Sequence, residues 1–240
     1  MAKIHVLLTK KELDRERLPG KVVVVLDILF ATTSIVAALA HGAAEVVPAL
    51  DGDAALAEAR GRDPATCVLA GELNAETLPG FWHPTPLALM RADIAGKSLI
   101  YCTTNGTVAL HKSARADHVY AAALVNGRAV VERIVQAHGD ETVLIVCSGS
   151  ADNFNLEDFY GAGHFVSLFR RLAPERYEYT DAAAAAETLY AHADAMECLT
   201  RARVGRMMLE RRLEDEIRFA AQKDRFDVVP KLANGLLRPV

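Results

Sequence analysis

The stretch that decides the fold is KVVVVLD at residues 21–27, followed by ATTSIVAALAHG at residues 31–42. The first segment is β-branched and almost continuously apolar, which is typical of a strand covered on both faces. The second contains Ile35, Leu39 and several alanines and ends at Gly42, a pattern that predicts a tightly packed helix. Together the two segments predict a buried parallel strand that leads into a helix.

Other short apolar runs follow the same scheme, and most of them precede a helical pattern. The predicted strands cover residues 45–50, 66–72, 97–103, 118–124 and 142–150, and the predicted helices cover 51–61, 107–115, the stretch NGRAVVERIVQAHG, and residues from about Asn155 onward. This alternation predicts a layered α/β/α fold with a mostly parallel or mixed sheet. The order of the strands is left open.

The last third of the chain has a different composition. From about residue 171 it is rich in alanine, arginine and glutamate, with helical patterns through Gln222, and FDVVPKL at residues 226–232 is predicted to be a late strand. Because no Gly/Ser-rich linker interrupts the chain, residues 1–240 are predicted to form a single domain with a helical C-terminal part. That part packs on the same sheet or on a second subunit, so a homodimer stays an open alternative.

Composition narrows the class of protein. The chain has 240 residues, 51% of them hydrophobic, and a formal net charge of -4, which argues against nucleic acid as a partner. Its four cysteines (Cys67, Cys102, Cys147 and Cys198) are widely spaced without a CxxC pair, as is typical of a reducing compartment. No apolar run is long enough to span a bilayer, so we expect a cytoplasmic location and no membrane partner.

Polar residues gather where the predicted strands end. In open α/β sheets, ligands bind beyond the carboxyl ends of the strands, where helix amino termini attract anions. Four such segments stand out: Asp27 with Thr32 and Thr33; Glu72; the run Thr103, Thr104, Asn105, Gly106 and Thr107; and Ser148, Gly149 and Ser150 with Asn155, Glu157 and Asp158. Their convergence predicts a single site that binds a small anion.

Asp27 and Glu72 are the first candidates for chemistry. Asp27 ends a run of five apolar residues, where an ionised carboxylate is costly to desolvate unless a cation or hydrogen-bond donors meet it. The alternative role for Asp27 is a helix cap, because aspartate is common at that position. Glu72 follows CVLAG in the same kind of position, and it is either a ligand or a solvated strand end.

The two remaining segments place glycine next to hydrogen-bonding side chains. Backbone N–H groups of TTNGT, residues 103–107, suit an anion nest, with an ordinary threonine-capped turn as the alternative. In CSGSADNFNLED, Glu157 and Asp158 belong to the first turn of a predicted helix, where the helix dipole favours negative charge. Adjacent residues point to different faces of a helix, so these two acids compete as partners of Asp27 on a shared metal.

The oxygen-rich set of donors favours a hard metal ion. Carboxylates without a His/Cys cluster favour Mg²⁺ over zinc, and two or three of them with water suit an ion that bridges to a phosphate ester. Cys102 and Cys147 also lie near strand ends, but free cysteines are usually small buried hydrophobes. His83 in the loop GFWHPTP is either an acid–base group or a surface histidine without a role.

Taken in order, these segments resemble the 2-phosphosulfolactate phosphatase family. LDILFATTSIVAALAHG is similar to the family's first signature, CTTNGT and CSGSADNFNLEDFYGAG to its later loops, and DRFDVVPKL to its terminal Asp and Val-Pro segment. The resemblance spans roughly residues 20–232. It implies a Mg²⁺-dependent phosphatase that hydrolyses a phosphomonoester of a small sulfonated or carboxylated hydroxy acid to the hydroxy acid and phosphate.

The resemblance also implies roles for the residues at the strand ends. Asp27, Glu72 and Glu157 would be catalytic, and Mg²⁺ would be held by Asp27 and Glu72 with Glu157 or Asp158. Whether Asp27 is instead a nucleophile is left open. The phosphorylated anion would be held by the polar loops, namely Thr32, Thr33, Thr103, Thr104, Asn105, Gly106, Thr107, Ser148 and Gly149.

The chain departs from the family pattern at the positions expected to bind an anion. Phe30 and Leu73 stand where the pattern carries arginine, and Trp82 stands where it carries an acid. Two guanidinium groups suited to bidentate binding of phosphate or sulfonate are thus absent at those positions. Two alternatives follow: a phosphatase of the same fold with a less anionic or more aromatic substrate, and a non-catalytic anion-binding homologue.

Overall fold

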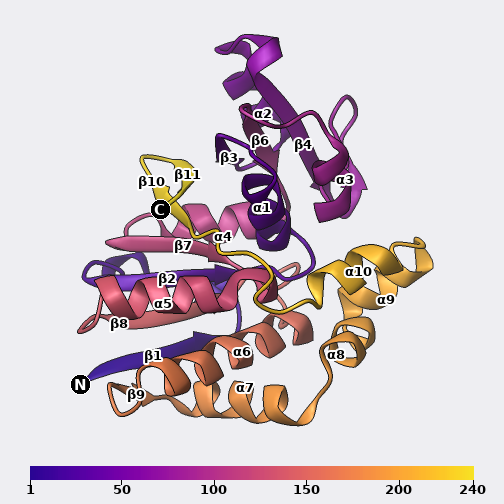
Figure 1. Cartoon of the computed structure of the whole chain (residues 1–240). Coiled ribbons are helices and arrows are strands. Elements are labelled where there is room, and N and C mark those ends of the chain that lie inside the picture. The colour runs from indigo at the N-terminus through magenta and orange to yellow at the C-terminus, as the bar shows by residue number, and fades with distance from the viewer.

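A computed structural model describes residues 1–240 and confirms the α/β fold with helical layers around a mixed, mostly parallel sheet (Figure 1). The strands are β1 (Ala2–Leu7), β2 (Lys21–Leu26), β3 (Glu45–Ala49), β4 (Cys67–Leu73), β5 (Glu76–Thr77), β6 (Ser98–Cys102), β7 (His118–Ala122), β8 (Thr142–Cys147), β9 (Tyr177–Tyr179), β10 (Pro230–Ala233) and β11 (Leu236–Pro239). The helices are α1 (Ala31–Ala40), α2 (Gly52–Arg60), α3 (Pro86–Arg91), α4 (Gly106–Ser113), α5 (Gly127–Ala137), α6 (Leu156–Leu172), α7 (Asp181–His192), α8 (Ala195–Arg201), α9 (Arg203–Glu210) and α10 (Glu214–Ala220).

Strand β2 lies inside the sheet between β7 and β8 and runs parallel to both. Its side chains alternate between two cores. Val22, Val24 and Leu26 pack in the core that contains residues of α5 and α6, whereas Val23 and Val25 pack in the core that contains residues of α1 and α4. Because burial of one such side chain contributes about 1.5–3 kcal/mol, this sequence stabilises a strand with a helical layer on each face.

The C-terminal hairpin joins two parallel parts of the sheet. The strand order is β5-β4-β6-β3-β11-β10-β7-β2-β8-β1-β9, and β10 and β11 pair antiparallel with each other and with β7 and β3. Figure 1 shows this hairpin in yellow between the two parts, which are steeply inclined to one another. The successive antiparallel pairings reverse the strand direction between the two parts. Their carboxyl ends therefore do not lie along one straight edge, and they come together because the two parts are inclined.

The structure contains elements that the sequence patterns do not predict. Strand β1, the short strand β9 and helix α3 are absent from the expected set. The late strand predicted at residues 226–232 is present as β10, but its predicted start is wrong, because pairing begins only at Pro230. Asn234 and Gly235 then have positive φ values of 52° and 79°, as a two-residue Asn-Gly hairpin turn requires. None of the helices combines the length and the apolar character needed to cross a bilayer.

The hairpin should hold the two parts of the sheet together, because Leu237 is fully buried where β11 pairs with Val46 of β3. Leu237→Ala should lower the free energy of unfolding, measured with urea, by about 2–5 kcal/mol. Leu56→Ala on α2 is the matched control, since Leu56 is 44% exposed and its truncation should cost about 0.5 kcal/mol or less. Equal losses in the two variants would contradict the role assigned to the hairpin.

Candidate active site

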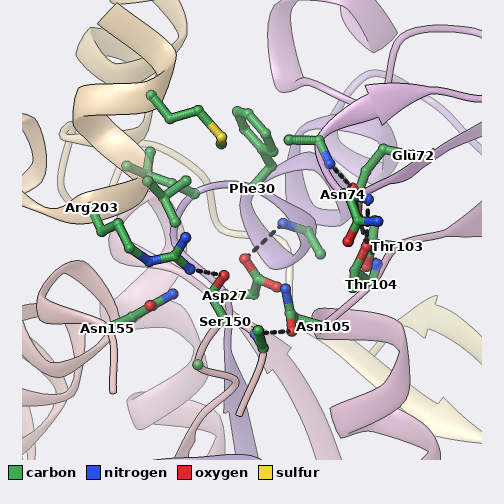
Figure 2. A pocket seen from close by; sticks show the side chains of 17 residues that line it. Asp27, Phe30, Glu72, Asn74, Thr103, Thr104, Asn105, Ser150, Asn155 and Arg203 are labelled. Carbon is green, nitrogen blue, oxygen red and sulfur yellow. Dashed lines mark hydrogen bonds between the residues drawn. The ribbon is translucent and has the colours of Figure 1, made fainter. Parts of the chain in front are cut away.

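A cavity opens where the ends of four strands meet one helix of the C-terminal part. The segments that follow β2, β4, β6 and β8 line it on one side, and α9 lines it on the other (Figure 2). All four segments singled out in the sequence contribute to it. The polar residues in its lining include Asp27, Glu72, Thr103, Thr104, Asn105, Gly149, Ser150, Asn155 and Arg203.

Asp27 lies directly after β2 and meets the first turn of α1. Its Oδ1 accepts a hydrogen bond from the Ala31 N–H at 3.2 Å, and the residue is buried yet lines the cavity. Burial, reinforced by the negative charge of Glu72, raises the pKa of Asp27 to about 6, although the Ala31 hydrogen bond and the charge of Lys10 act in the opposite direction. Asp27 thus interacts with a helix start and also faces the space where a ligand would bind.

Thr32 and Thr33 lie behind the cavity and do not line it. The Thr32 hydroxyl donates to the Asp27 carbonyl at 3.0 Å and accepts from the Asp27 N–H at 2.8 Å. The Thr33 hydroxyl donates to the Ile28 carbonyl at 2.8 Å. Both threonines are fully buried, so the contacts that they make shape the loop that carries Asp27.

Glu72 fastens the end of β4 to the loop after β6. Its Oε1 accepts from the Thr104 N–H at 2.6 Å, and its Oε2 accepts from the Thr104 hydroxyl at 3.2 Å and from the Ala75 N–H. Because Glu72 also lines the cavity, it is more than a solvated strand end. Each carboxylate oxygen can accept more than one partner, so these bonds leave capacity for a cation.

The loop of residues 103–107 is closed by its own hydrogen bonds. The Thr107 hydroxyl accepts from the Thr103 N–H at 3.2 Å and donates to the Thr103 carbonyl at 2.9 Å. Glycine is needed at position 106, because a Cβ there would lie 2.7 Å from Asp27 Oδ2 and 2.4 Å from the Ala31 Cβ. Gly106 and Thr107 therefore bring the start of α4 close to Asp27 without lining the cavity, whereas the three preceding residues line it.

A buried lysine, which no sequence pattern marks as a site residue, connects two of the polar loops. Lys10 is 4% exposed, and its Nζ donates to Asn105 Oδ1 at 2.9 Å and to the Ser148 carbonyl at 3.0 Å. Ser148 itself is fully buried and outside the cavity lining. In the sequence, Lys10 stands beside Lys11 near the amino terminus and has the pattern of an ordinary surface charge.

Glu157 and Asp158 lie in the first turn of α6, and neither lines the cavity. Asp158 accepts the Ile28 N–H at 2.9 Å and the Gly149 N–H at 3.1 Å, one on each oxygen. Glu157 is 1% exposed, and neither of its carboxylate oxygens has a hydrogen-bond partner. Burial, together with the charge of Asp27, raises the pKa of Glu157 to about 7. The two competing acids therefore differ, since only Glu157 has unused oxygens.

The buried acids fit a divalent cation. The charge of Asp27 raises the pKa of both Glu157 and Asp158, in addition to the larger effect of burial. Unpartnered carboxylate oxygens beside a second buried carboxylate are unfavourable unless a cation or protons compensate them. Oxygen donors of this kind suit Mg²⁺, so the residues present match the metal that the sequence predicts.

Helix α9 contributes one basic and two apolar side chains to the cavity. Arg203 hydrogen-bonds to Ser150 Oγ (Figure 2), and Val204 and Met207 line the cavity together with Phe30. Among the lining residues Arg203 is the only lysine or arginine. The sequence offers little signal for it, because several arginines between residues 201 and 218 are interleaved with acids.

Phe30 and Leu73, where the family resemblance would place arginine, have different surroundings. Phe30 lines the cavity, whereas Leu73 is 58% exposed and lies outside the lining. Only the absence of arginine at position 30 therefore bears directly on a ligand in this cavity. Arg203 provides a guanidinium group there from a different element.

The cysteines near the strand ends are buried free thiols. Burial and the charge of Glu72 raise the pKa of Cys102 to about 11, and burial with the charge of Asp158 raises the pKa of Cys147 well above its ordinary value. Both stay protonated at neutral pH, as packing residues do. His83 lies outside this cavity, with its Nδ1 2.9 Å from Thr85 Oγ1, and burial lowers its pKa.

Comparison with known proteins identifies relatives over nearly the full length. The family model described as 2-phosphosulpholactate phosphatase matches residues 7–235. A probable 2-phosphosulfolactate phosphatase of Symbiobacterium thermophilum is 35% identical over 224 residues, which cover 92% of this chain and 94% of that protein. A protein of Caldanaerobacter subterraneus with the same description is 35% identical over 228 residues, covering 94% of this chain and 92% of that protein.

The raised pKa of Glu157 predicts a pH-dependent stability. Because its folded-state pKa of about 7 exceeds the ordinary value of 4.5, the folded protein binds the proton more tightly than the unfolded chain, and stability is lost as the pH rises through this interval. In metal-free protein, Glu157→Gln should gain up to roughly 3 kcal/mol over the wild type between about pH 5 and pH 8 in denaturation experiments. The exposed Glu175→Gln is the control; parallel profiles for Glu157→Gln and wild type would disprove the assignment.

Proposed function

The chain belongs to the 2-phosphosulfolactate phosphatase family, and from this we propose that it is a Mg²⁺-dependent phosphoric monoester hydrolase. Its proposed substrate is a phosphomonoester of a small sulfonated or carboxylated hydroxy acid, and its products are the hydroxy acid and phosphate. The observation that carries the proposal is the buried, unpartnered carboxylate of Glu157, on which the charges of Asp27 and Arg203 act from the lining of the cavity. A cation held by Glu157 and Asp27 would bind the phosphate group of the substrate, and Arg203 would bind its second acid group.

In the proposed site, Asp27 and Glu72 hold the metal, with Glu157 as the third carboxylate. Asp27 and Glu72 both line the cavity, and Glu157 has both oxygens free. Asp158 is the weaker candidate because each of its oxygens already accepts a backbone N–H. When bound there, Mg²⁺ would offset the charge of the phosphoryl oxygens and lower the pKa of a water molecule, which would act as the nucleophile.

The loops beside the carboxylates are proposed to bind the phosphate. Thr103, Thr104 and Asn105 line the cavity at the start of α4, where backbone N–H groups and the helix dipole favour an anion. The Asn105 Oδ1 accepts from Lys10 and from the Ala151 N–H, which leaves its NH₂ group as a donor. Gly149 adds a further lining position with a φ of 66°.

Other residues predicted for the anion site would act through the loops and not by contact. Thr32, Thr33, Gly106, Thr107 and Ser148 are buried outside the cavity lining. We propose that they orient Asp27 and the donors of the 103–107 loop. Positioning of this kind matters because a catalytic constellation loses effectiveness when its groups are displaced by as little as about 1 Å.

A substrate with a larger apolar portion is the second candidate. Phe30, Val204 and Met207 give one wall of the cavity an apolar character, which favours a carbon skeleton over a densely charged molecule. A homologue that binds anions without turnover is the remaining alternative. Phosphate release and binding, measured on a panel of phosphorylated hydroxy acids with and without Mg²⁺, would distinguish all three.

Asp27→Asn tests the metal site, because it keeps the shape of the side chain and removes its charge. Mg²⁺-dependent phosphate release should fall by about 100-fold or more. The melting temperature should stay the same or rise, since a buried neutral amide is less costly than a buried carboxylate. The exposed Asp53→Asn on α2 is the control. Wild-type turnover and Mg²⁺ affinity in Asp27→Asn would reject the assignment.

Arg203→Leu tests recognition of the second acid group. The kcat/KM for 2-phosphosulfolactate should fall by about 10- to 100-fold, the effect of one charge-assisted hydrogen bond, with a much smaller change for p-nitrophenyl phosphate. Arg206→Leu, on the same helix but exposed and outside the cavity lining, is the matched control. Adding Phe30→Arg to Arg203→Leu should restore part of the loss. Equal values for the two leucine variants would show that another group binds the substrate acid.

A further inference from the structure

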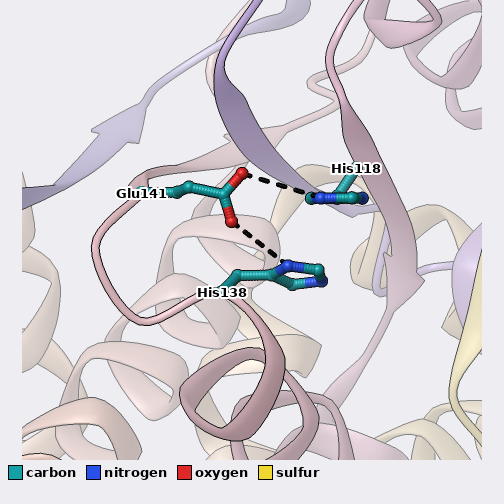
Figure 3. Close-up of side chains that lie close together, drawn as sticks. All are labelled: His118, His138 and Glu141. Atoms are coloured by element: carbon teal, nitrogen blue, oxygen red, sulfur yellow. Dashed lines mark ion pairs between the residues drawn. The ribbon is translucent and has the colours of Figure 1, made fainter.

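His118, His138 and Glu141 form a compact group (Figure 3), and none of them lines the cavity. His118 is the first residue of β7, His138 follows the last residue of α5, and Glu141 precedes β8. All three therefore lie toward the amino ends of these parallel strands, whereas Asp27 and Gly149 follow the carboxyl ends of β2 and β8. The group is separate from the proposed phosphatase site.

Glu141 lies between the two imidazoles. Its Oε2 is 3.1 Å from His138 Nδ1, its Oε1 is 3.6 Å from His118 Nε2, and one ligand atom from each residue lies within 4.8 Å of the others. Two ligands on the same tetrahedral ion, each bonded at 2.0–2.2 Å, are separated by about 3.4 Å, a value that the two nitrogen–oxygen distances bracket. We propose that this group binds one divalent transition-metal ion of the zinc type, with water completing the coordination.

Tyr120 supplies the outer partner that a metal-binding histidine needs. Its hydroxyl lies 2.7 Å from His138 Nε2, so Nδ1 is the nitrogen that faces Glu141. A tyrosine hydroxyl can donate or accept, and it accommodates the tautomer in which Nε2 carries the proton and Nδ1 presents its lone pair. Hydrogen bonds of this kind fix ring orientation and tautomer at metal sites.

One ring must turn when the ion binds. The two imidazoles stack with centroids 3.8 Å apart and planes inclined by 21°, so their in-plane lone pairs run side by side. No hydrogen bond holds the His118 ring, because its Nδ1 is buried without a partner and its Nε2 lies beyond hydrogen-bonding distance of Glu141, so a turn of the ring breaks none. Its side chain is 27% exposed, which gives an ion and a water molecule access to the site.

The set of ligands separates this site from the carboxylates of the cavity. Two imidazoles and one carboxylate favour Zn²⁺ or Co²⁺, whereas oxygen-only donors favour Mg²⁺. Bound metal would join the start of β7 and the residues before β8, which belong to the sheet, to the end of α5, a helix that packs against it. The expected consequence is greater stability and not catalysis, because none of the three residues lines the cavity.

The test uses the full chain carrying Asp27→Asn, so that the cavity carboxylates compete less for the ion. After treatment with a chelator, the protein is titrated with Zn²⁺ by calorimetry and with Co²⁺ by visible absorption. We expect one ion per chain, a melting temperature raised by several degrees, and the absorption bands of tetrahedral Co²⁺. Excess Mg²⁺ should not displace the ion.

Two variants and one control decide the outcome. His118→Ala and Glu141→Gln should each abolish binding and the melting-temperature increase, whereas His192→Ala, an exposed histidine on α7, should leave both unchanged. His138 is retained so that Tyr120 keeps its partner. The proposal is overturned if Zn²⁺ and Co²⁺ fail to bind, or if they bind equally well to His118→Ala and Glu141→Gln.

Discussion

The carboxylate of Asp158 accepts the backbone N–H groups of Ile28 and Gly149, at 2.9 and 3.1 Å, and thereby joins the segments after β2 and β8. This interaction is buried, and burial raises the pKa of Asp158 well above its ordinary value. An acid at that depth persists because its partners are fixed donors in the backbone. The rest of the site depends on this junction, since it sets where Asp27 and Gly149 stand around one cavity.

The neighbouring acids are all buried, but they differ in how many hydrogen bonds their carboxylates accept. Asp158 has a donor on each oxygen, and Asp27 has one from Ala31. Glu157 has none, so folding places an unsatisfied carboxylate beside other acids. A buried carboxylate without hydrogen-bond partners destabilises the folded protein by itself, and binding of a cation to it stabilises the folded protein. For this reason we assign to Asp158 the structural role of joining the two loops, and to Glu157 the proposed role of metal ligand.

The sequence predicts well whatever depends on local pattern. The valine run of β2, strand ends within one residue of Asp27 and Thr103, and the start of α6 after Asn155 all agree with the structure. The sequence does not reveal the reversal of strand direction across the C-terminal hairpin, because pairing between β11 and β3 is a long-range event. It also misses Lys10 and Arg203, since a basic residue near a terminus or in a charged helical region has no pattern that distinguishes a cavity or core contact from a surface one.

Arg203 lies on a different element from the carboxylates of the proposed metal site, so the proposed recognition of a substrate acid is separate from the proposed metal chemistry. The carboxylates come from segments anchored to the sheet, and their geometry is restricted by backbone hydrogen bonds and by the close approach of Gly106 to Asp27. Arg203 comes from α9, a short helix whose side chains enter from the other wall. In the proposed site, a guanidinium group carried by α9 can therefore determine which acid group is recognised without moving Asp27 or Glu72. An apolar Phe30 beside intact carboxylates is consistent with retained metal chemistry and a changed contact to the organic part of the substrate.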